Sequence, residues 1–125
     1  MHRVWIAVLA CAVAACSFLA LAGPASASGD AAKQPRTSCD QERFGSTYIT
    51  SLKQRNTKCG TAKKVARKFT ECRKDNGGAN GHCNQTVAHY SCNEGKREGN
   101  KFQYNAKVHC SRGGNKVTFT YTQQK

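Results

Sequence analysis

The sequence predicts a small α+β domain in which one amphipathic helix packs on an antiparallel sheet and disulfides tie the fold together. Three observations support this prediction: apolar residues recur with the helical period in one segment, apolar and polar residues alternate in two later segments, and 8 of the 125 residues are cysteines. A chain of this length accommodates one domain, which excludes a two-domain enzyme.

Residues 1–27 have the pattern of a secretory signal peptide. A short basic start containing Arg3 precedes an uncharged apolar run, and residues 25–27 (Ala-Ser-Ala) supply the small side chains of a cleavage site. We therefore expect cleavage after Ala27 and a secreted protein without a stable membrane span. Two alternatives stay open: a retained membrane helix, and a lipid anchor through Cys16.

Residues 28–38 are small and polar and predict a disordered spacer, so the single folded domain is expected to span residues 39–125. Within that domain, residues 47–52 (Thr-Tyr-Ile-Thr-Ser-Leu) are rich in strand-forming side chains and predict a first strand.

The helix follows, with Thr61 as the expected N-cap and the glycines at 77–78 as the stop signal. Its apolar residues recur at spacings of three and four, which places them within an arc of about 120°. They are Ala62, Val65, Ala66, Phe69 and Cys72. We expect this arc to face the sheet.

Two later segments alternate strictly and predict strands on either side of a turn at 111–115. The residues expected to face the core are Phe102, Tyr104, Ala106, Val108 and Cys110 in the first segment and Val117, Phe119 and Tyr121 in the second. Upstream, residues 88–92 predict one more strand, which a loop at 93–100 follows. The expected order is β-α-β-β-β.

Removal of the signal leaves six cysteines, and an even number in a small secreted domain predicts three disulfides. They are Cys39, Cys59, Cys72, Cys83, Cys92 and Cys110. If the strands around residues 93–100 form a hairpin, matching apolar faces places Cys92 and Cys110 on the core face. We expect Cys72 to bond to one of these two and Cys59 to the other, although six cysteines permit 15 connectivities.

The chain is strongly basic, with 20 Lys+Arg against 7 Asp+Glu and a formal charge of +13. Loss of Arg3 with the signal leaves +12 on residues 28–125. The expected binding residues lie on the polar face of the helix and the outer face of the sheet, and are Lys63, Lys64, Arg67, Lys68, Lys74, Lys101 and Lys107. This charge predicts an anionic polymer or surface as partner: cell envelope, nucleic acid or anionic lipid. The competing interpretation is a solvated surface that keeps a secreted protein soluble.

Three histidines, His82, His89 and His109, support an alternative enzymatic function. One imidazole can deprotonate the 2′-hydroxyl of RNA, a second can protonate the leaving oxygen, and a lysine can stabilise the developing charge. The alternative is therefore a small secreted ribonuclease, with His89 and His109 as candidate cross-strand neighbours. The competing interpretation is that these histidines are scattered over the surface.

A loose set of zinc ligands is formed by His82, Cys83, His89 and Cys92. Cysteines in an oxidising compartment are better explained by disulfides, so neither a metal nor another cofactor is expected. Two further alternatives are an antimicrobial or effector protein and an inhibitor of extracellular proteases, for which the loops at 79–82 or 93–100 could serve. Membrane lysis through the helix would require unfolding, because its apolar side faces the core.

Two short motifs carry a family resemblance. Residues 59–65 have the pattern Cys-x-x-Ala-x-x-Val, and residues 108–113 have the pattern Val-x-Cys-x-x-Gly. With a cysteine at 92 between them, residues 48–121 resemble a family of small, basic, disulfide-bonded domains secreted by actinobacteria. The resemblance implies a signal peptide and an extracellular domain but no site residues, and Cys39 and Cys72 are additional to its pattern.

The sequence as a whole favours a secreted, monomeric, non-enzymatic cationic domain. Its expected role is to bind an anionic surface or polymer, with the ribonuclease, the effector and the protease inhibitor as the alternatives.

Overall fold

The computed structural model describes residues 35–125. In chain order, the elements are β1 (Thr37–Cys39), β2 (Glu42–Phe44), β3 (Thr47–Arg55), α1 (Cys59–Asp75), the 3-10 turn η1 (Gly78–Asn80), β4 (Ser91–Glu94), β5 (Glu98–Gly99), β6 (Gln103–Arg112) and β7 (Asn115–Gln124). The predicted signal peptide, the candidate lipid anchor Cys16 and residues 28–34 of the predicted spacer lie outside the described residues. The spacer prediction is wrong at its C-terminal end, because Thr37 and Ser38 belong to β1 and pair with β3.

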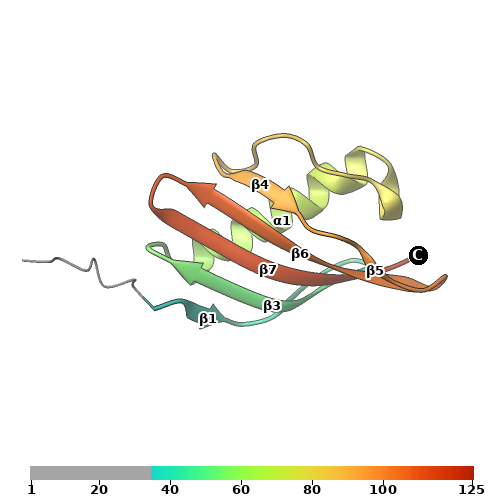
Figure 1. The fold of residues 1–125 in the computed structure, drawn as a ribbon, viewed down its shortest axis with the longest axis horizontal. Helices are drawn as coiled ribbons and strands as arrows, with labels where there is room; N and C mark the ends of the chain where they lie inside the picture. Colours follow the sequence, from blue (N-terminus) through green and yellow to red (C-terminus); the bar gives the residue numbers. More distant parts are fainter. Residues whose placement is uncertain (1–34) are drawn as a thin grey trace, which may run out of the picture. The chain divides into compact units, whose positions relative to one another are not determined.

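The sheet is antiparallel and has the strand order β1-β3-β7-β6-β4, with β2 also pairing with β3 and β5 with β6. The one α-helix within residues 35–125, α1, lies behind the sheet in Figure 1 and contacts β3 and β7. The predicted α+β class and the β-α-β-β-β order of the longer elements are therefore confirmed, with three short strands added. After β3 the chain runs through α1 to β4, at the other edge of the sheet. β6 and β7 then fill the space between β4 and β3, so that β3 pairs with β7.

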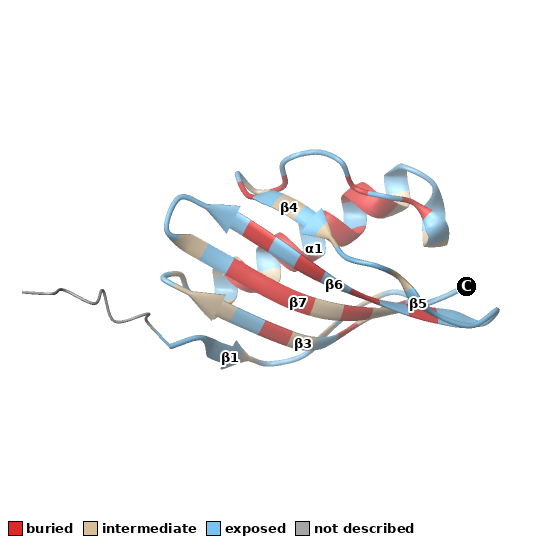
Figure 2. Cartoon of the chain, viewed as in Figure 1, coloured by how far each residue is buried: buried red, intermediate tan, exposed pale blue. Residues whose placement is uncertain are grey.

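The predicted alternation is confirmed in β6, where buried and exposed residues succeed each other along the strand (Figure 2). The predicted core residues of β6 and β7 are buried, with one exception. The prediction for Phe102 is wrong, because its side chain is 69% exposed. β6 begins one residue later, and Phe102 lies in the bend that precedes it.

β3 contains a bulge between Ile49 and Ser51. Side chains alternate along a regular strand, so without the bulge Ile49 and Leu52 would face opposite sides of the sheet. The extra residue brings both side chains into the core, where each is 1% exposed. The predicted strand at 47–52 is confirmed and continues to Arg55.

α1 buries the whole of its predicted apolar arc. The helix begins three residues earlier than predicted, because the carbonyl of Lys58 already accepts a helical hydrogen bond from Ala62 at 3.0 Å. Lys58 is therefore the N-cap, and Thr61 lies within the first turn. The helix ends with Asn76 as its C-cap, directly before the predicted stop at Gly77. Within residues 35–125, no helix has both the length and the apolar character needed to cross a membrane.

Arg73 is a charged residue on the buried side of α1. It follows Phe69 by four positions, which places it within the apolar arc, and it is 0% exposed. Four of its five N–H groups donate, at 2.7–3.3 Å, to Ala79 O, Tyr104 Oη, Thr47 Oγ1 and Gln123 Oε1. These hydrogen bonds and the ring of Tyr121, 4.4 Å from the guanidinium, offset the cost of burying the charge.

Three disulfides join Cys39 to Cys59, Cys72 to Cys83 and Cys92 to Cys110. The predicted number is confirmed, but the predicted pairing is wrong. Cys92 and Cys110 face the core as expected, yet they are direct partners in the β4–β6 register, with Cα atoms 4.0 Å apart, and so bond to each other. Cys72 bonds instead to Cys83 in the segment after the helix.

Peptide mapping without reduction is expected to recover these three pairs and no free thiol. The bridged cysteines are 11 to 20 residues apart in sequence, and the chain-entropy model assigns about 3 kcal/mol to a bridge that closes a loop of this size. Reduction is therefore expected to lower the urea midpoint of unfolding. A peptide that links Cys72 to Cys92 or Cys110 would contradict this connectivity.

Two substitutions of Arg73 separate the effect of its charge from that of its size. Arg73→Lys keeps a buried charge without the planar fork and is expected to cost on the order of 3 kcal/mol of unfolding free energy. Arg73→Met removes the charge, while Ala79 O and Gln123 Oε1 keep hydrogen bonds from Tyr104 and Thr47. Its expected cost is smaller, about 1.5 kcal/mol. Urea titration of both variants measures the difference, and a larger loss in the Met variant would contradict this account.

Candidate functional site

The first of the predicted binding cations, Lys63, is engaged within the protein. Its ammonium lies 2.8 Å from Glu42 of β2 and 3.6 Å from Asp40. The hydrogen bond to Glu42 raises the pKa of Lys63. A ligand would have to compete with these two carboxylates for this ammonium.

The remaining helical cations divide into engaged and open groups. Lys68 pairs with Glu71 at 2.7 Å, and Lys74 donates at 2.9 Å to a backbone carbonyl of β2. Lys64 and Arg67 are exposed and form no ion pair with a described residue. The helix face thus carries less uncompensated charge than its sequence predicts.

The sheet face opposite α1, here called the open face, has a higher density of uncompensated charge. No helix of residues 35–125 covers it (Figure 1). The register groups four cations on it, Lys53 and Arg55 from β3, Lys107 from β6 and Lys116 from β7, and a fifth, Arg43 of β2, lies on the same face opposite Tyr48. None of the four forms an ion pair with a described residue.

The open face combines cations and hydroxyl groups in rows that cross its strands. One cross-strand row contains Lys53, Thr118 and His109, the next contains Arg55, Lys116 and Ser111, and a third contains Ser51, Thr120 and Lys107. Neighbouring strands are about 4.8 Å apart, so the outer members of a row are separated by about 10 Å. The open face therefore presents cations and hydroxyl donors over a width of three strands.

Two of the predicted binding residues are separated by the fold. Lys107 lies on the open face, as predicted, whereas Lys101 lies in the exposed bend before β6, beside Phe102. The open face has one acid among its strand residues, Glu98 of β5, which pairs with Asn105 near the end of the sheet. The strands that carry the four cations contribute no acid to it.

The three histidines do not form the predicted pair. His109 lies on the open face, opposite Asn93 and 3.3 Å from the hydroxyl of Thr118. His89 lies in the turn before β4, so the prediction that it is the cross-strand neighbour of His109 is wrong. His82 lines a hollow of about 360 Å³ beside β4 that neither of the other two lines. Residues 35–125 contain no group of side chains suited to hold a metal ion.

The clearest polar constellation surrounds Glu94, on the helix side of the sheet. Its side chain is 7% exposed and is bound by Arg97 through both Nε and Nη2. Arg97 also donates to the carbonyls of Asn80 and Gly81. The loops at 79–82 and 93–100, each predicted as a possible inhibitory loop, are therefore tied to each other by one guanidinium.

Glu94 remains ionised despite its burial. Burial raises the pKa of this carboxyl, but the hydrogen bonds from Arg97 and Tyr121 and the charge of Arg97 outweigh it, so the pKa is lowered. His82 lies 3.8 Å from the same carboxylate. Burial, with the hydrogen bond to Glu94, raises the pKa of Tyr121 far above its usual value and keeps it a donor.

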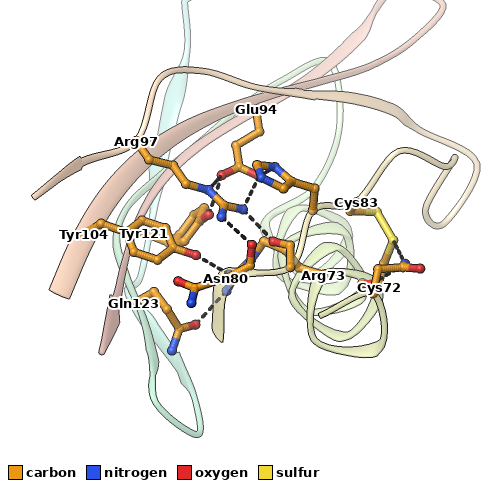
Figure 3. A network of polar contacts seen from close by, with 12 residues as sticks. Cys72, Arg73, Asn80, Cys83, Glu94, Arg97, Tyr104, Tyr121 and Gln123 are labelled. Carbon is orange, nitrogen blue, oxygen red and sulfur yellow. Dashed lines mark hydrogen bonds and ion pairs between the residues drawn. A yellow bond between two sulfur atoms is a disulfide. The ribbon is translucent and has the colours of Figure 1, made fainter. Parts of the chain in front are cut away.

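Tyr121 connects this constellation to Arg73. Its hydroxyl donates to Glu94 at 2.7 Å, and its ring lies against the Arg73 guanidinium. Figure 3 shows the sequence of contacts from Gln123 through Arg73 and the tyrosines to Arg97 and Glu94. This network joins the C-terminal part of α1 to β4, β6 and β7. We call it the clamp; its members are Arg73, Glu94, Arg97, Tyr104, Tyr121 and Gln123, and it stabilises the fold.

No known protein family, curated protein or solved structure matches this chain. The assignment of a site therefore depends on its own residues.

Part of the site was within reach of the sequence. The first predicted strand ends at residue 52. If it is extended by three residues, alternation places Lys53 and Arg55 on the face of the sheet that Leu52 does not occupy. The predicted loop at 93–100 is wrong at Glu94, which ends β4. The partners of Glu94 and Arg97 include residues 80, 81 and 121, and no local spacing encodes those contacts.

Glu94→Gln tests the clamp through its pH dependence. The folded-state pKa of Glu94 lies below its ordinary value of 4.5, so the carboxylate stabilises the fold above that value and this contribution is lost as pH falls through the folded pKa. The variant is expected to lose about 3 kcal/mol near neutral pH and to show a flatter fall in stability in acid. Glu71→Gln, at an exposed ion pair, is the control and should change stability by no more than about 0.5 kcal/mol. Equal losses would contradict a buried clamp.

Proposed function

We propose that the protein is secreted and binds an anionic polymer or surface through the open face of its sheet. The observation that carries the proposal is the set of four cations on this face, Lys53, Arg55, Lys107 and Lys116, none of which is paired with a described carboxylate. Three disulfides support an extracellular setting, since such bonds persist in oxidising compartments.

The use of the acids supports the open face over the helix. Glu42 and Glu71 pair with helical lysines, and Glu94 pairs with Arg97. An anion at Lys63 or Lys68 would have to displace a carboxylate, which leaves Lys64 and Arg67 as the open cations of the helix face, whereas none of the four cations of the open face has a carboxylate partner among the described residues. Each phosphate, sulfate or carboxylate bound there would gain its full Coulomb attraction, which salt weakens.

The hydroxyls between the cations support a repeating anionic ligand. Thr118 and Thr120 lie in the central strand of the open face, and Lys53 and Lys107 lie on the strands at either side. A chain of anions that crosses from Lys53 to Thr118, or from Lys107 to Thr120, would meet a cation and then, about 4.8 Å further on, a hydroxyl donor. This arrangement carries no base-reading groove or deep pocket, so charge and spacing, rather than sequence, would be recognised.

A pair of matched double variants tests the location. Lys53→Thr with Lys107→Thr removes two charges from the open face, and Lys64→Gln with Arg67→Gln removes two from the helix. Threonine favours strands and glutamine favours helices, so each pair of substitutions suits its element. On a heparin column, the sheet variant is expected to elute at lower salt. Its plot of log affinity against log salt should lose a slope of about two, because each removed lysine releases about one fewer counterion.

The helix variant is the control for net charge, because it carries the same total charge as the sheet variant. It is expected to elute close to the unmodified protein. Equal losses in the two variants would mean that the whole-molecule charge, and not the open face, determines retention. Retention of the unmodified protein no better than that of a neutral protein at physiological salt would refute polyanion binding.

A further inference from the structure

Phe102 is the one large apolar side chain that the described residues leave exposed, at 69%. The bend that holds it is firmly fixed. Asn100 accepts, through Oδ1, the N–H groups of Phe102 and Gln103, and the backbone N–H of Lys125 donates to the carbonyl of Phe102. A Cβ at Gly99 would overlap the backbone of the returning strand, so only glycine permits this closure.

Lys101 and Phe102 are both exposed and do not pack in the core, although hydrogen bonds fix the backbone around them. The ammonium of Lys101 lies 5.0 Å from the centre of the Phe102 ring. Because the backbone hydrogen bonds hold the bend, it presents one cation and one exposed aromatic ring in fixed positions. A partner that covered both groups would lose little conformational entropy in ordering them.

A cationic hollow of about 200 Å³ adjoins the same bend. Its lining residues are Asn80, Arg97, Gly99, Asn100, Tyr104 and Lys125. Two of these side chains, Arg97 and Lys125, are cationic, and Arg97 is also paired with the carboxylate of Glu94, which lies outside the lining. Two of the lining residues, Asn100 and Lys125, also hold the backbone of Phe102 in place, so the hollow and the exposed ring share their supports.

Donors remain available within the hollow. The ammonium of Lys125 makes one hydrogen bond, to Asn100 O at 3.1 Å, which leaves two of its three N–H groups. Arg97 Nη1 makes one, to Asn80 O at 2.7 Å, and retains a second N–H. These remaining N–H groups of Arg97 and Lys125 match the hydrogen-bonding needs of a phosphate group, which would share Arg97 with Glu94.

We propose that this hollow and Phe102 together bind an anionic phospholipid at a membrane surface, with the headgroup phosphate in the hollow and the phenyl ring inserted among the acyl chains. The proposal deepens the proposed function, on which it rests in part, because it names one anionic surface and adds a contact point outside the open face. An exposed ring on a projecting bend fits a deformable apolar medium, and the adjacent phosphate site matches the interface between headgroups and chains.

Flotation with vesicles tests the role of the ring through a matched pair of variants. Phe102→Ser removes the apolar group, and Phe102→Leu keeps one. The protein and its Leu variant are expected to float with vesicles of phosphatidylcholine and phosphatidylglycerol, and the Ser variant is expected to bind them about tenfold more weakly. All three should elute together from heparin, since the ring takes no part in charge pairing.

Phe102→Trp supplies a second readout that does not depend on affinity. Trp5, in the predicted signal peptide, is the only tryptophan of the chain, so after its removal position 102 would report alone. Its fluorescence is expected to shift to the blue with phosphatidylglycerol vesicles and to stay unchanged with heparin or with inorganic phosphate.

Several outcomes would overturn the inference. Equal binding of the Ser variant and the unmodified protein would remove the ring from the contact, and equal binding to pure phosphatidylcholine would remove the phosphate site. If soluble glycerophosphoglycerol fully displaced the protein from vesicles, and the Ser variant bound vesicles as well as the unmodified protein, the ligand would be a free phosphate and not a membrane. A loss of single-stranded DNA binding in the Ser variant, without a loss on vesicles, would indicate base stacking instead. If the unmodified protein were not retained on heparin but the fluorescence of the Phe102→Trp variant still shifted to the blue with vesicles, the proposed function of the open face would be refuted and the phospholipid inference would stand.

Discussion

The fold depends on how two buried charges are satisfied. The Arg73 guanidinium and the Glu94 carboxylate both lie on the helix side of the sheet, and Tyr121 separates them: its ring contacts the cation and its hydroxyl donates to the anion. A buried charge without partners would cost several kcal/mol, so each must keep its hydrogen bonds. This requirement fixes the position of α1 relative to β7. Through Arg97, which binds Glu94, it also fixes the loops at 79–82 and 93–100.

The placement of the acids shapes the charge of the protein surface. The described chain has few acids, and those at positions 42, 71 and 94 are engaged in ion pairs on the helix side. The positive charge of the open face is therefore left without internal compensation. A basic chain of this kind separates into a helix side on which carboxylates and cations meet and a sheet side on which cations and hydroxyls face the solvent, and that separation gives the molecule a direction for binding anions.

Periodicity was sufficient to predict the helix and the longer strands, but it missed the short strands β1, β2 and β5 and failed where a single residue interrupts it. The arc from Ala62 to Cys72 and the alternation from Tyr104 to Cys110 were predictable, because the core needs one apolar side on each element. Phe102 continues the alternation in sequence but precedes the strand. The bulge after Ile49 has the opposite effect, since it places two residues on one face that alternation would separate.

The sequence by itself determined the number of disulfides, the amphipathic helix, the long strands and the excess of positive charge, because each is encoded in composition or in local spacing. Only the tertiary structure decided that Cys92 faces Cys110, that β3 lies beside β7, and that the cations of β3 and β6 share one face. These outcomes depend on which strands are neighbours. Strand order is set by the packing of the whole core, and no local pattern of residues records it.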